Sequence, residues 1–464
     1  MAAHPRGPAG TTTPVEDNVL ARRLTQEIEG DVLFDPFSRG RYSTDASHYQ
    51  IEPIGVVVPK TADEISRVIE IAADEGVPVL PRGGGTSQCG QTVGEAVVVD
   101  VSKHLNRVLD FDVEARTAWV EPGLVLDQLN AFLKPHGLWF PVDVSTSSRA
   151  TLGGMTGNNS CGARSIRYGP MRDNVRAIEA VLMDGETMHF GELSDNVAGA
   201  GLSPRQQTLV RQEAKEIKER FPDLMRRVGG YNIDALMPGG PGRGDWANTT
   251  VGRPQTHPNL AHLLVGSEGT LAFSTRIQID LQPLTAHKVL GVCHFSAFFD
   301  AMDSSRHIVE LDPAAVELVD HTMVDLARDI PLFRPTVERF VRGEPEALLL
   351  VEFAGQDRDI QLRSLKRLGE LIGDLGFPGA VLEAVTGLGY DALVEERLVR
   401  PLGLDGPHLA VDGHRLRLHT RDTAQDQHRA IENAERTLDL DREVDVPRGI
   451  DEVQLVGLVV IHPG

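Results

Sequence analysis

Apolar runs and helically spaced apolar positions alternate along the first part of the chain. Residues 54–59 (IGVVVP) and 77–83 (VPVLPRG) are apolar runs typical of buried strands. Residues 61–76 between them have the apolar spacing of a helix, with Thr61 as N-cap and Glu64 completing a capping box. A helix that joins two buried strands predicts a parallel βαβ unit.

The same kind of pattern continues over most of the remaining chain. Before residue 286 we expect strands at 95–101, 116–123, 138–142, 177–185 and 263–283, and helices at 18–29, 124–137 and 204–221. After residue 286 we expect strands at 287–296, 314–320 and 346–355, and helices at 297–310 and 357–374. This mixture predicts an α+β fold.

These elements divide the 464 residues into separate parts. We expect a disordered start at 1–15, a first domain at 16–285, a second domain at 286–400 and an atypical tail at 401–464. Within the first domain, an insertion rich in Gly and Pro at 192–260 separates core segments at 50–190 and 260–285.

Charge and cysteine content narrow the class of protein. The formal net charge of −21 argues against a nucleic-acid partner, because phosphate binding needs clustered Lys and Arg. Cys89, Cys161 and Cys293 form no CxxC pair and predict neither a disulfide framework nor a metal site. The chain shows no apolar leader and no long apolar run, so we expect no signal peptide and no membrane span. The simplest location is the cytoplasm, free or peripheral to the inner face of the membrane.

A glycine-rich loop, PRGGGTSQCG (81–90), directly follows the second strand. Its three consecutive glycines can adopt positive φ and expose backbone N–H groups, which together form an anion-binding nest. The loop does not match GxGxxG, and no GK[ST] occurs, so neither a Rossmann fingerprint nor a P-loop is supported. A glycine-rich turn without a ligand explains this loop alone equally well.

Two further segments rich in small residues strengthen the ligand hypothesis. TLGGMTGNNSCG (151–162) can carry the backbone close past a flat ligand, and VGSEGTLAF (265–273) places two glycines just before a strand. Each segment alone is also explained as a tight turn with an Asn or Ser cap. Three such segments in one chain favour a ligand.

In this order and spacing, the segments resemble the p-cresol methylhydroxylase-type FAD domain of the vanillyl-alcohol oxidase superfamily. The resemblance covers residues 50–285 and is greatest with the D-lactate, glycolate and D-2-hydroxyglutarate dehydrogenase branch. NNSCGARSIRYG and the long insertion most resemble bacterial D-2-hydroxyglutarate dehydrogenase-like proteins, in which an iron–sulfur half follows the flavin half. The resemblance implies a two-subdomain FAD-binding domain followed by a ferredoxin-like α+β substrate domain, here expected to be incomplete at its C-terminal end.

The resemblance also implies roles for individual residues around FAD. The pyrophosphate would be held through backbone amides of Arg82, Gly83, Gly84, Gly85, Thr86, Ser87 and Gln88. The other side of the cofactor would be lined by Thr151, Gly153, Gly154, Asn158, Asn159, Ser160 and Gly162. The flavin ring and ribityl chain would lie near Gly266, Ser267, Glu268, Gly269 and Thr270.

The mode of FAD attachment follows from one position in the first loop. Relatives with histidyl-linked FAD carry a His after the loop glycines, and this chain has Thr86 there, which predicts non-covalent FAD. A cysteinyl link through Cys161 is the alternative, and a buried structural Cys is favoured over it.

Candidate catalytic residues are fewer. The resemblance implies a carboxylate-binding arginine in LVEERLVRPLGL (393–404), which nominates Arg400 with Arg397 as runner-up, and a surface arginine is an equal alternative. Tyr231 and Arg227 are candidates for the wall beside the flavin, although a helix end with a packed aromatic explains their segment equally well.

The family's C-terminal histidine motif is not found, and no cysteine cluster suits an iron–sulfur centre. The histidine pair in HRLRLH (414–419) is more typical of an exposed tail, so no metal site is predicted. The leading hypothesis is an FAD-dependent oxidoreductase that oxidises a small D-2-hydroxy acid and passes electrons to an acceptor other than NAD. The alternatives are a truncated or non-enzymatic flavin-binding remnant and a flavin subunit that depends on an iron–sulfur partner or on a quinone or cytochrome acceptor.

Overall fold

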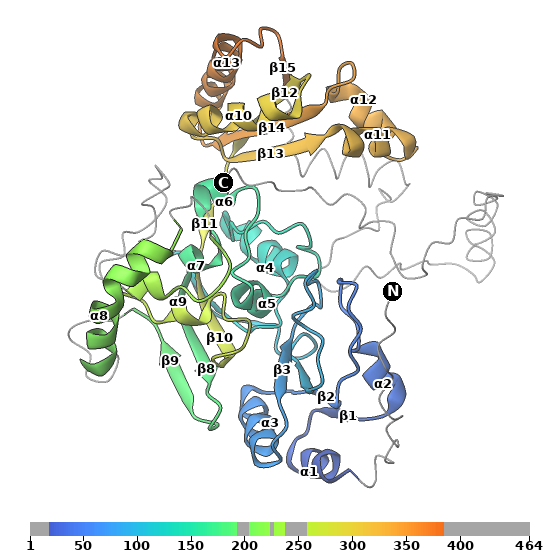
Figure 1. Ribbon diagram of the computed structural model, residues 1–464, viewed down its shortest axis with the longest axis vertical. Helices are drawn as coiled ribbons and strands as arrows, with labels where there is room; N and C mark the ends of the chain where they lie inside the picture. The colour runs from blue at the N-terminus through green and yellow to red at the C-terminus, as the bar shows by residue number, and fades with distance from the viewer. Residues whose placement is uncertain (1–17, 193–203, 223–226, 237–257, 385–464) are drawn as a thin grey trace, which may run out of the picture. The chain divides into compact units, whose positions relative to one another are not determined.

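The computed structural model describes residues 18–192, 204–222, 227–236 and 258–384 (Figure 1). Its helices are α1 (Val19–Glu27), α2 (Pro36–Arg41), α3 (Ala62–Asp74), α4 (Leu126–Leu133), α5 (Leu152–Gly157), α6 (Ser165–Tyr168), α7 (Met171–Asn174), α8 (Pro204–Arg220), α9 (Ala261–Leu264), α10 (Phe298–Ile308), α11 (His321–Asp329), α12 (Arg334–Phe340) and α13 (Arg358–Asp374). Its strands are β1 (Asp31–Leu33), β2 (Gly55–Val58), β3 (Val79–Arg82), β4 (Val97–Asp100), β5 (Val108–Asp112), β6 (Thr117–Val120), β7 (Leu138–Trp139), β8 (Val175–Val181), β9 (Thr187–Phe190), β10 (Phe273–Asp280), β11 (Gln282–Pro283), β12 (His287–Phe295), β13 (Ala315–Asp320), β14 (Ala347–Gly355) and β15 (Val381–Ala384).

The chain divides into two compact units. Among the described residues, the first unit contains those up to Thr285 together with Asp312–Val316, and the second contains Ala286–Leu311 and those from 317 to 384.

The first unit begins with a four-stranded sheet in the order β1-β2-β4-β3. Strands β2 and β3 both pair in parallel with β4, and α3 connects β2 to β3, which confirms the parallel βαβ unit. Val56 and Val57 on β2 are both fully buried although they point to opposite faces, because α1 and α3 cover one face and Leu33, Tyr42 and Leu80 pack on the other. Burial on both faces explains why β2 is an unbroken apolar run.

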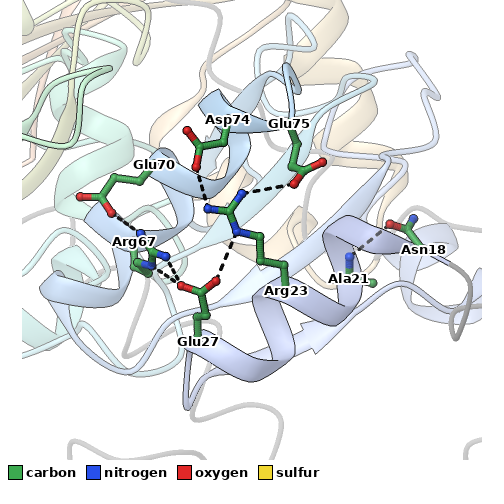
Figure 2. Close-up of polar contacts among 8 residues, drawn as sticks. All are labelled: Asn18, Ala21, Arg23, Glu27, Arg67, Glu70, Asp74 and Glu75. Atoms are coloured by element: carbon green, nitrogen blue, oxygen red, sulfur yellow. Dashed lines mark hydrogen bonds and ion pairs between the residues drawn. The ribbon is translucent and has the colours of Figure 1, made fainter.

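Helix α1 is fastened to α3 by an ion-pair network at the surface (Figure 2). Arg23 contacts Glu27 on its own helix and both Asp74 and Glu75 at the end of α3. Arg67 of α3 bonds back to Glu27. These hydrogen bonds raise the pKa of the Arg23 guanidinium, with Asp74 the largest contributor. The network holds α1 in register while apolar packing beneath it supplies most of the stability.

A second sheet of the first unit has the order β5-β6-β10-β8-β9 and is antiparallel throughout. Helices α4, α5 and α9 contribute to a core formed by Leu129, Leu152, Leu264 and Ile277, all at most 3% exposed. Two of the small-residue segments predicted from the sequence are attached to these helices. Segment 151–162 contains α5, and segment 265–273 directly follows α9.

The second unit is a four-stranded sheet in the order β13-β14-β12-β15, with α10 and α13 in contact with β12 and β14. Apart from α11 and α12, which lie between β13 and β14, the chain order is β-α-β-β-α-β, and with this strand order it is a ferredoxin-like arrangement, as expected. Gly291 of β12 lets α13 approach closely, since a Cβ there would lie 2.5 Å from Leu368 Cδ2. The expected loss at the C-terminal end of this domain concerns residues after 384, which lie outside the described residues.

The capping box predicted for α3 was only half right. The Thr61 hydroxyl accepts a hydrogen bond from Glu64 N at 3.4 Å, as an N-cap should. The Glu64 carboxylate, however, accepts from Lys60 N and Glu29 N rather than from Thr61 N. Because β1 begins close to this helix end, the carboxylate ties the chain before β1 to α3 instead.

We predict that Leu24→Ala lowers the free energy of unfolding by about 2–5 kcal/mol, because Leu24 is 0% exposed at the contact of α1 with the first sheet. Urea denaturation followed by circular dichroism measures the change. Arg23→Ala on the same helix is the control, and its smaller effect should shrink further in high salt. Equal, salt-independent effects of the two substitutions would contradict this assignment.

Candidate cofactor site

The three small-residue segments predicted from the sequence meet in the first unit. A Cβ added to Gly83 in the first loop would lie 2.0 Å from Thr151 Oγ1 in the second segment. The second segment bonds to the third through Gly266 N to Thr156 O and Glu268 N to Gly157 O, each at 2.9 Å. At Gly83 the space beside the backbone is therefore filled by the Thr151 side chain, and the second and third segments are joined directly through their backbones.

The first loop presents a run of backbone N–H groups. Within the described part of the chain, no acceptor pairs with the N–H groups of residues 83–88, while Gly85 O accepts from Ala46 N at 3.1 Å. None of these six residues is fully buried, and Gly85 has a φ of +65°. Accessible, unpaired N–H groups in a tight glycine loop can bind a phosphate or pyrophosphate.

The Arg82 side chain has a structural task in this loop. Its guanidinium donates to Tyr42 O and Thr92 O at 3.2 and 3.1 Å and to Thr44 O at 2.7 Å. Burial lowers the pKa of Arg82, and the guanidinium also lies over the Tyr42 ring with 5.2 Å to the ring centroid. Arg82 therefore closes the loop at its base, and the expected phosphate contact through backbone amides remains a prediction.

The second segment is a short helix with its N-terminus against the first loop. Thr151 caps α5 by accepting from Gly154 N at 3.4 Å. Gly153 passes Pro122 so closely that a Cβ would lie 2.6 Å from Pro122 Cβ, and a Cβ on Gly162 would lie 1.8 Å from Asp143 O. After the helix, Asn158 donates to Ser160 Oγ at 3.2 Å.

The third segment is a tight loop after α9. Gly266, Glu268 and Gly269 all have positive φ, of 84°, 55° and 75°. A Cβ on Gly269 would lie 2.7 Å from Pro81 Cγ, so this loop also touches the start of the first one. Glu268 is the non-glycine residue among these three, and its left-handed backbone is strained. Strain of this kind persists where the surrounding structure fixes the backbone, which is common at ligand sites.

Glu268 links the third segment to the first. Its Oε1 accepts from Gln91 Nε2 at 3.4 Å, and Gln91 Oε1 accepts from the Ser87 hydroxyl. Burial raises the pKa of the Glu268 carboxyl, and the bond from Gln91 opposes this shift. The side chain of Glu268, which is an exposed residue, thus joins the loop expected near the flavin to the loop expected near the pyrophosphate.

The insertion places Tyr231 at the site and commits Arg227 elsewhere. The Tyr231 hydroxyl lies 2.8 Å from Thr270 Oγ1, and the residue is 44% exposed. Arg227 donates to Asp234 Oδ1 at 2.6 Å and lies over the Phe221 ring. We therefore regard Arg227 as a structural cation, and Tyr231 remains a candidate for the wall beside the cofactor.

Several other sequence candidates are not placed at the site. Arg400, Arg397 and the 414–419 histidine pair lie outside the described residues. Cys161 is partly buried within the second segment. Within the described ranges, no three His, Cys, Asp or Glu side chains cluster as metal ligands.

The residues present fit FAD on grounds of their own geometry. The amides of the first loop, which have no partner among the described residues, suit a pyrophosphate, and Gly83 and Gly153 let the segments approach where any side chain would collide. A fully buried amide donor, Asn159 Nδ2, has no hydrogen-bond partner among the residues that the structure describes, which is compatible with a ligand contact.

Comparison with known families agrees with this geometry. The family described as FAD binding domain matches residues 53–191, and the family described as FAD linked oxidases, C-terminal domain, matches residues 284–384. Both domains of an FAD-linked oxidase are therefore present in this chain. FAD is therefore the cofactor of this chain's first unit.

Similar proteins extend the comparison. D-2-hydroxyglutarate dehydrogenase of Haemophilus influenzae is 31% identical over 364 residues, which are 74% of this chain and 34% of that protein. The enzyme of the same name from Pantoea ananatis is 34% identical over 348 residues, 72% of this chain and 33% of that protein. This chain thus spans about a third of the length of these relatives.

The solved structures support the fold. An alkyldihydroxyacetonephosphate synthase superposes with a TM-score of 0.57 at 18% identity, covering 83% of this chain and 64% of that one. At this identity the likeness concerns the fold alone. In the part of this chain that the structure describes, no helix is long and apolar enough to cross a membrane.

Sequence reasoning missed two residues that shape the site. The Tyr42 hydroxyl donates to Asp100 Oδ2 at 2.7 Å, and burial raises the Tyr42 pKa beneath the first loop. Asn232 donates to His262 O and Val265 O and so fixes the insertion to the third segment. Both act across long sequence separations, for which a single sequence carries no signal.

We predict that Gly83→Ala weakens FAD binding by at least about tenfold, since a Cβ would collide with Thr151 Oγ1 and push the first loop away from the second segment. Titration of the apoprotein by flavin fluorescence measures the affinity. Gly40→Ala on α2, where a Cβ meets nothing within 4 Å, is the matched control and should bind FAD like the parent chain. Equal affinities of all three proteins would show that the loop packing does not shape the site.

We predict that Glu268→Gln changes how stability depends on pH. A raised pKa means that the folded protein binds the proton on the Glu268 carboxyl more tightly than the unfolded chain does. The protonated carboxyl therefore stabilises the folded state fully below the ordinary pKa of 4.5, and this stabilisation is lost as pH rises through the raised pKa. From about pH 4 to about pH 7 the apoprotein variant should therefore lose less stability than the parent chain. Urea unfolding across this range measures the difference, with Glu114→Gln at an exposed turn as control. Parallel curves for parent and Glu268→Gln would refute it.

Proposed function

We propose that this chain binds FAD without a covalent bond and oxidises a small D-2-hydroxy acid, of the D-2-hydroxyglutarate or D-lactate type, to the 2-oxo acid. The observation that carries the proposal is the meeting of the three small-residue segments around unpaired amides. The named activity of the D-2-hydroxyglutarate dehydrogenase relatives supports the substrate class. The electrons would pass to an acceptor other than NAD, because the sequence has no Rossmann fingerprint.

The described residues would bind and orient the cofactor. Residues 82–88 would hold the pyrophosphate, Thr151, Gly153, Gly154, Asn158, Asn159, Ser160 and Gly162 would line one side, and residues 266–270 would lie near the ring. Bound FAD supplies an acceptor for the two electrons of the substrate. Tyr231 would contribute to the wall of the substrate space from beside Thr270, and Arg400 is proposed to bind the substrate carboxylate.

A second candidate function is a flavin-binding electron-transfer subunit that is inactive without a partner. Two arginines near the three segments favour it. The Arg82 guanidinium bonds to backbone carbonyls and the Arg227 guanidinium to Asp234, so neither is available to bind a substrate carboxylate. An iron–sulfur protein, a quinone or a cytochrome would then exchange electrons with the flavin. For either function we propose a cytoplasmic location, free or peripheral to the membrane.

The experiment is an absorption spectrum of the purified chain with FAD. Heat denaturation should release the flavin into the supernatant, because Thr86 stands where a linking histidine would be. Anaerobic addition of D-2-hydroxyglutarate or D-lactate should then bleach the flavin band of the native protein, whereas the L-enantiomers should not. Flavin that stays with the precipitate would refute the non-covalent attachment. Flavin that no hydroxy acid bleaches would refute the independent activity and support the partner-dependent subunit.

A further inference from the structure

Arg172 on α7 is a buried cation whose hydrogen-bond donors are mostly unused. The residue is 6% exposed. Its acidic partner is the adjacent Asp173, whose Oδ1 accepts from Arg172 Nε at 3.1 Å. Neither terminal nitrogen of the guanidinium has an acceptor among the described residues. A buried charge is costly unless its donors are hydrogen-bonded, so the terminal nitrogens of Arg172 require an acceptor from elsewhere.

Asp173 fixes the guanidinium without covering its terminal nitrogens. The Asp173 side chain is 3% exposed, and its second oxygen, Oδ2, has no donor among the described residues. A Cβ on Gly169 would lie 2.4 Å from this Oδ2, so the carboxylate is wedged against the Gly169 backbone and cannot turn toward the rest of the guanidinium. Because Nε is held at one edge, the two terminal nitrogens form a free fork at another, which matches the two oxygens of a carboxylate.

Other arginines close to the three segments are bonded differently. Arg82 donates to backbone carbonyls through both terminal nitrogens. Arg164 and Arg227 each use a terminal nitrogen to pair with an aspartate. In Arg172 the internal bond goes through Nε instead, and the fork that recognises planar anions is left to a ligand.

The backbone holds Arg172 beside the place where the cofactor segments meet. Arg172 N donates to Asn159 Oδ1 at 3.0 Å. A Cβ on Gly266 would lie 3.2 Å from Asn159 Cβ and 3.3 Å from the carbonyl oxygen of Gly230, which precedes Tyr231. Arg172 is thus joined through one side chain to the point where the second segment, the third segment and the proposed wall of the substrate space come together.

We propose that Arg172 binds the second carboxylate of a dicarboxylic 2-hydroxy acid, so that the chain prefers substrates of the D-2-hydroxyglutarate type to those of the D-lactate type. This inference rests on the proposed function, in which Arg400 binds the carboxylate beside the hydroxyl group. D-Lactate has no second carboxylate, whereas D-2-hydroxyglutarate carries one at the far end of its carbon chain. Asp173 is a positioning residue, because it holds Nε and leaves the fork to the ligand.

The test uses the double variant Arg172→Gln/Asp173→Asn. It replaces the ion pair with a neutral pair of similar size, so neither buried charge is left without its partner. With an artificial electron acceptor, kcat/KM for D-2-hydroxyglutarate should fall about 10- to 100-fold, mainly through KM, because a hydrogen-bonded ion pair with the substrate is lost. For D-lactate, kcat/KM should stay within about threefold of the parent chain.

Arg220→Gln is the matched control, since the Arg220 side chain is 77% exposed and pairs with Glu216 on its own helix. This variant should resemble the parent chain with both acids. Arg172→Lys keeps the charge beside Asp173 but not the fork, so it should raise KM for D-2-hydroxyglutarate less than the double variant does.

A binding measurement decides the inference without turnover. Isothermal titration of the FAD-bound chain uses glutarate, a dicarboxylate that lacks the hydroxyl group, and butyrate, which has one carboxylate. Glutarate should bind the double variant at least about tenfold more weakly than it binds the parent chain or Arg220→Gln. Butyrate should bind all three proteins alike.

Three results would overturn the proposal. Equal losses with both hydroxy acids would show that Arg172 does not distinguish them. Weakened FAD binding in the double variant would assign the guanidinium to a cofactor phosphate, and unchanged binding and kinetics would assign its terminal nitrogens to buried water. In the last case reduction of the flavin by hydroxy acids would leave the proposed function standing. Glutarate binding that depends on Arg172, in a chain that no hydroxy acid reduces, would instead support the Arg172 site and remove only the proposed activity.

Discussion

The close approach of three backbone segments is the constraint on which the rest of the first unit depends. Gly83 of the first segment lies against Thr151 of the second, and Glu268 N of the third segment donates to Gly157 O of the second. The second segment is thus in contact with both of the others. Packing of this kind is possible only where side chains are small, because a Cβ at Gly83 would enter the space of its neighbour. The two sheets and their helices hold the segments at this distance.

The side-chain cations near the three segments are paired within the protein, and this decides how a negatively charged ligand could be held. The chain carries a formal charge of −21, yet the cations near the segments are spent internally: Arg82 on backbone carbonyls, Arg164 on Asp143 and Arg227 on Asp234. A phosphate-bearing ligand would therefore be held mainly by backbone N–H dipoles rather than by side-chain charge. This arrangement suits a cofactor that is bound once and retained, since fixed amides need no reorganisation when it enters.

Much of this fold could be predicted from the sequence, because its strands are apolar runs and its helices have regular apolar spacing. In the second unit the predicted bounds agree closely with the observed ones. The strand expected at 287–296 is β12 (His287–Phe295), and the helix expected at 357–374 is α13 (Arg358–Asp374). Helices α5 and α9 were not predicted because they are only 6 and 4 residues long, too short for periodicity to appear. The glycine segments could be recognised, but the role of Glu64 could not, since its partner Glu29 lies far away in the sequence, between α1 and β1.

The remaining features of the site share one physical property: each is energetically unfavourable in the folded chain without a ligand. Asn159 and Glu268 have left-handed backbones, and neither Asn159 Nδ2 nor the N–H groups of the first loop have an acceptor among the described residues. A ligand that supplies acceptors to these donors would bind the folded state and not the unfolded one, and its binding free energy would add to stability. The apoprotein should accordingly be the less stable form, and the order of this region would depend on the cofactor that the three segments are shaped to receive.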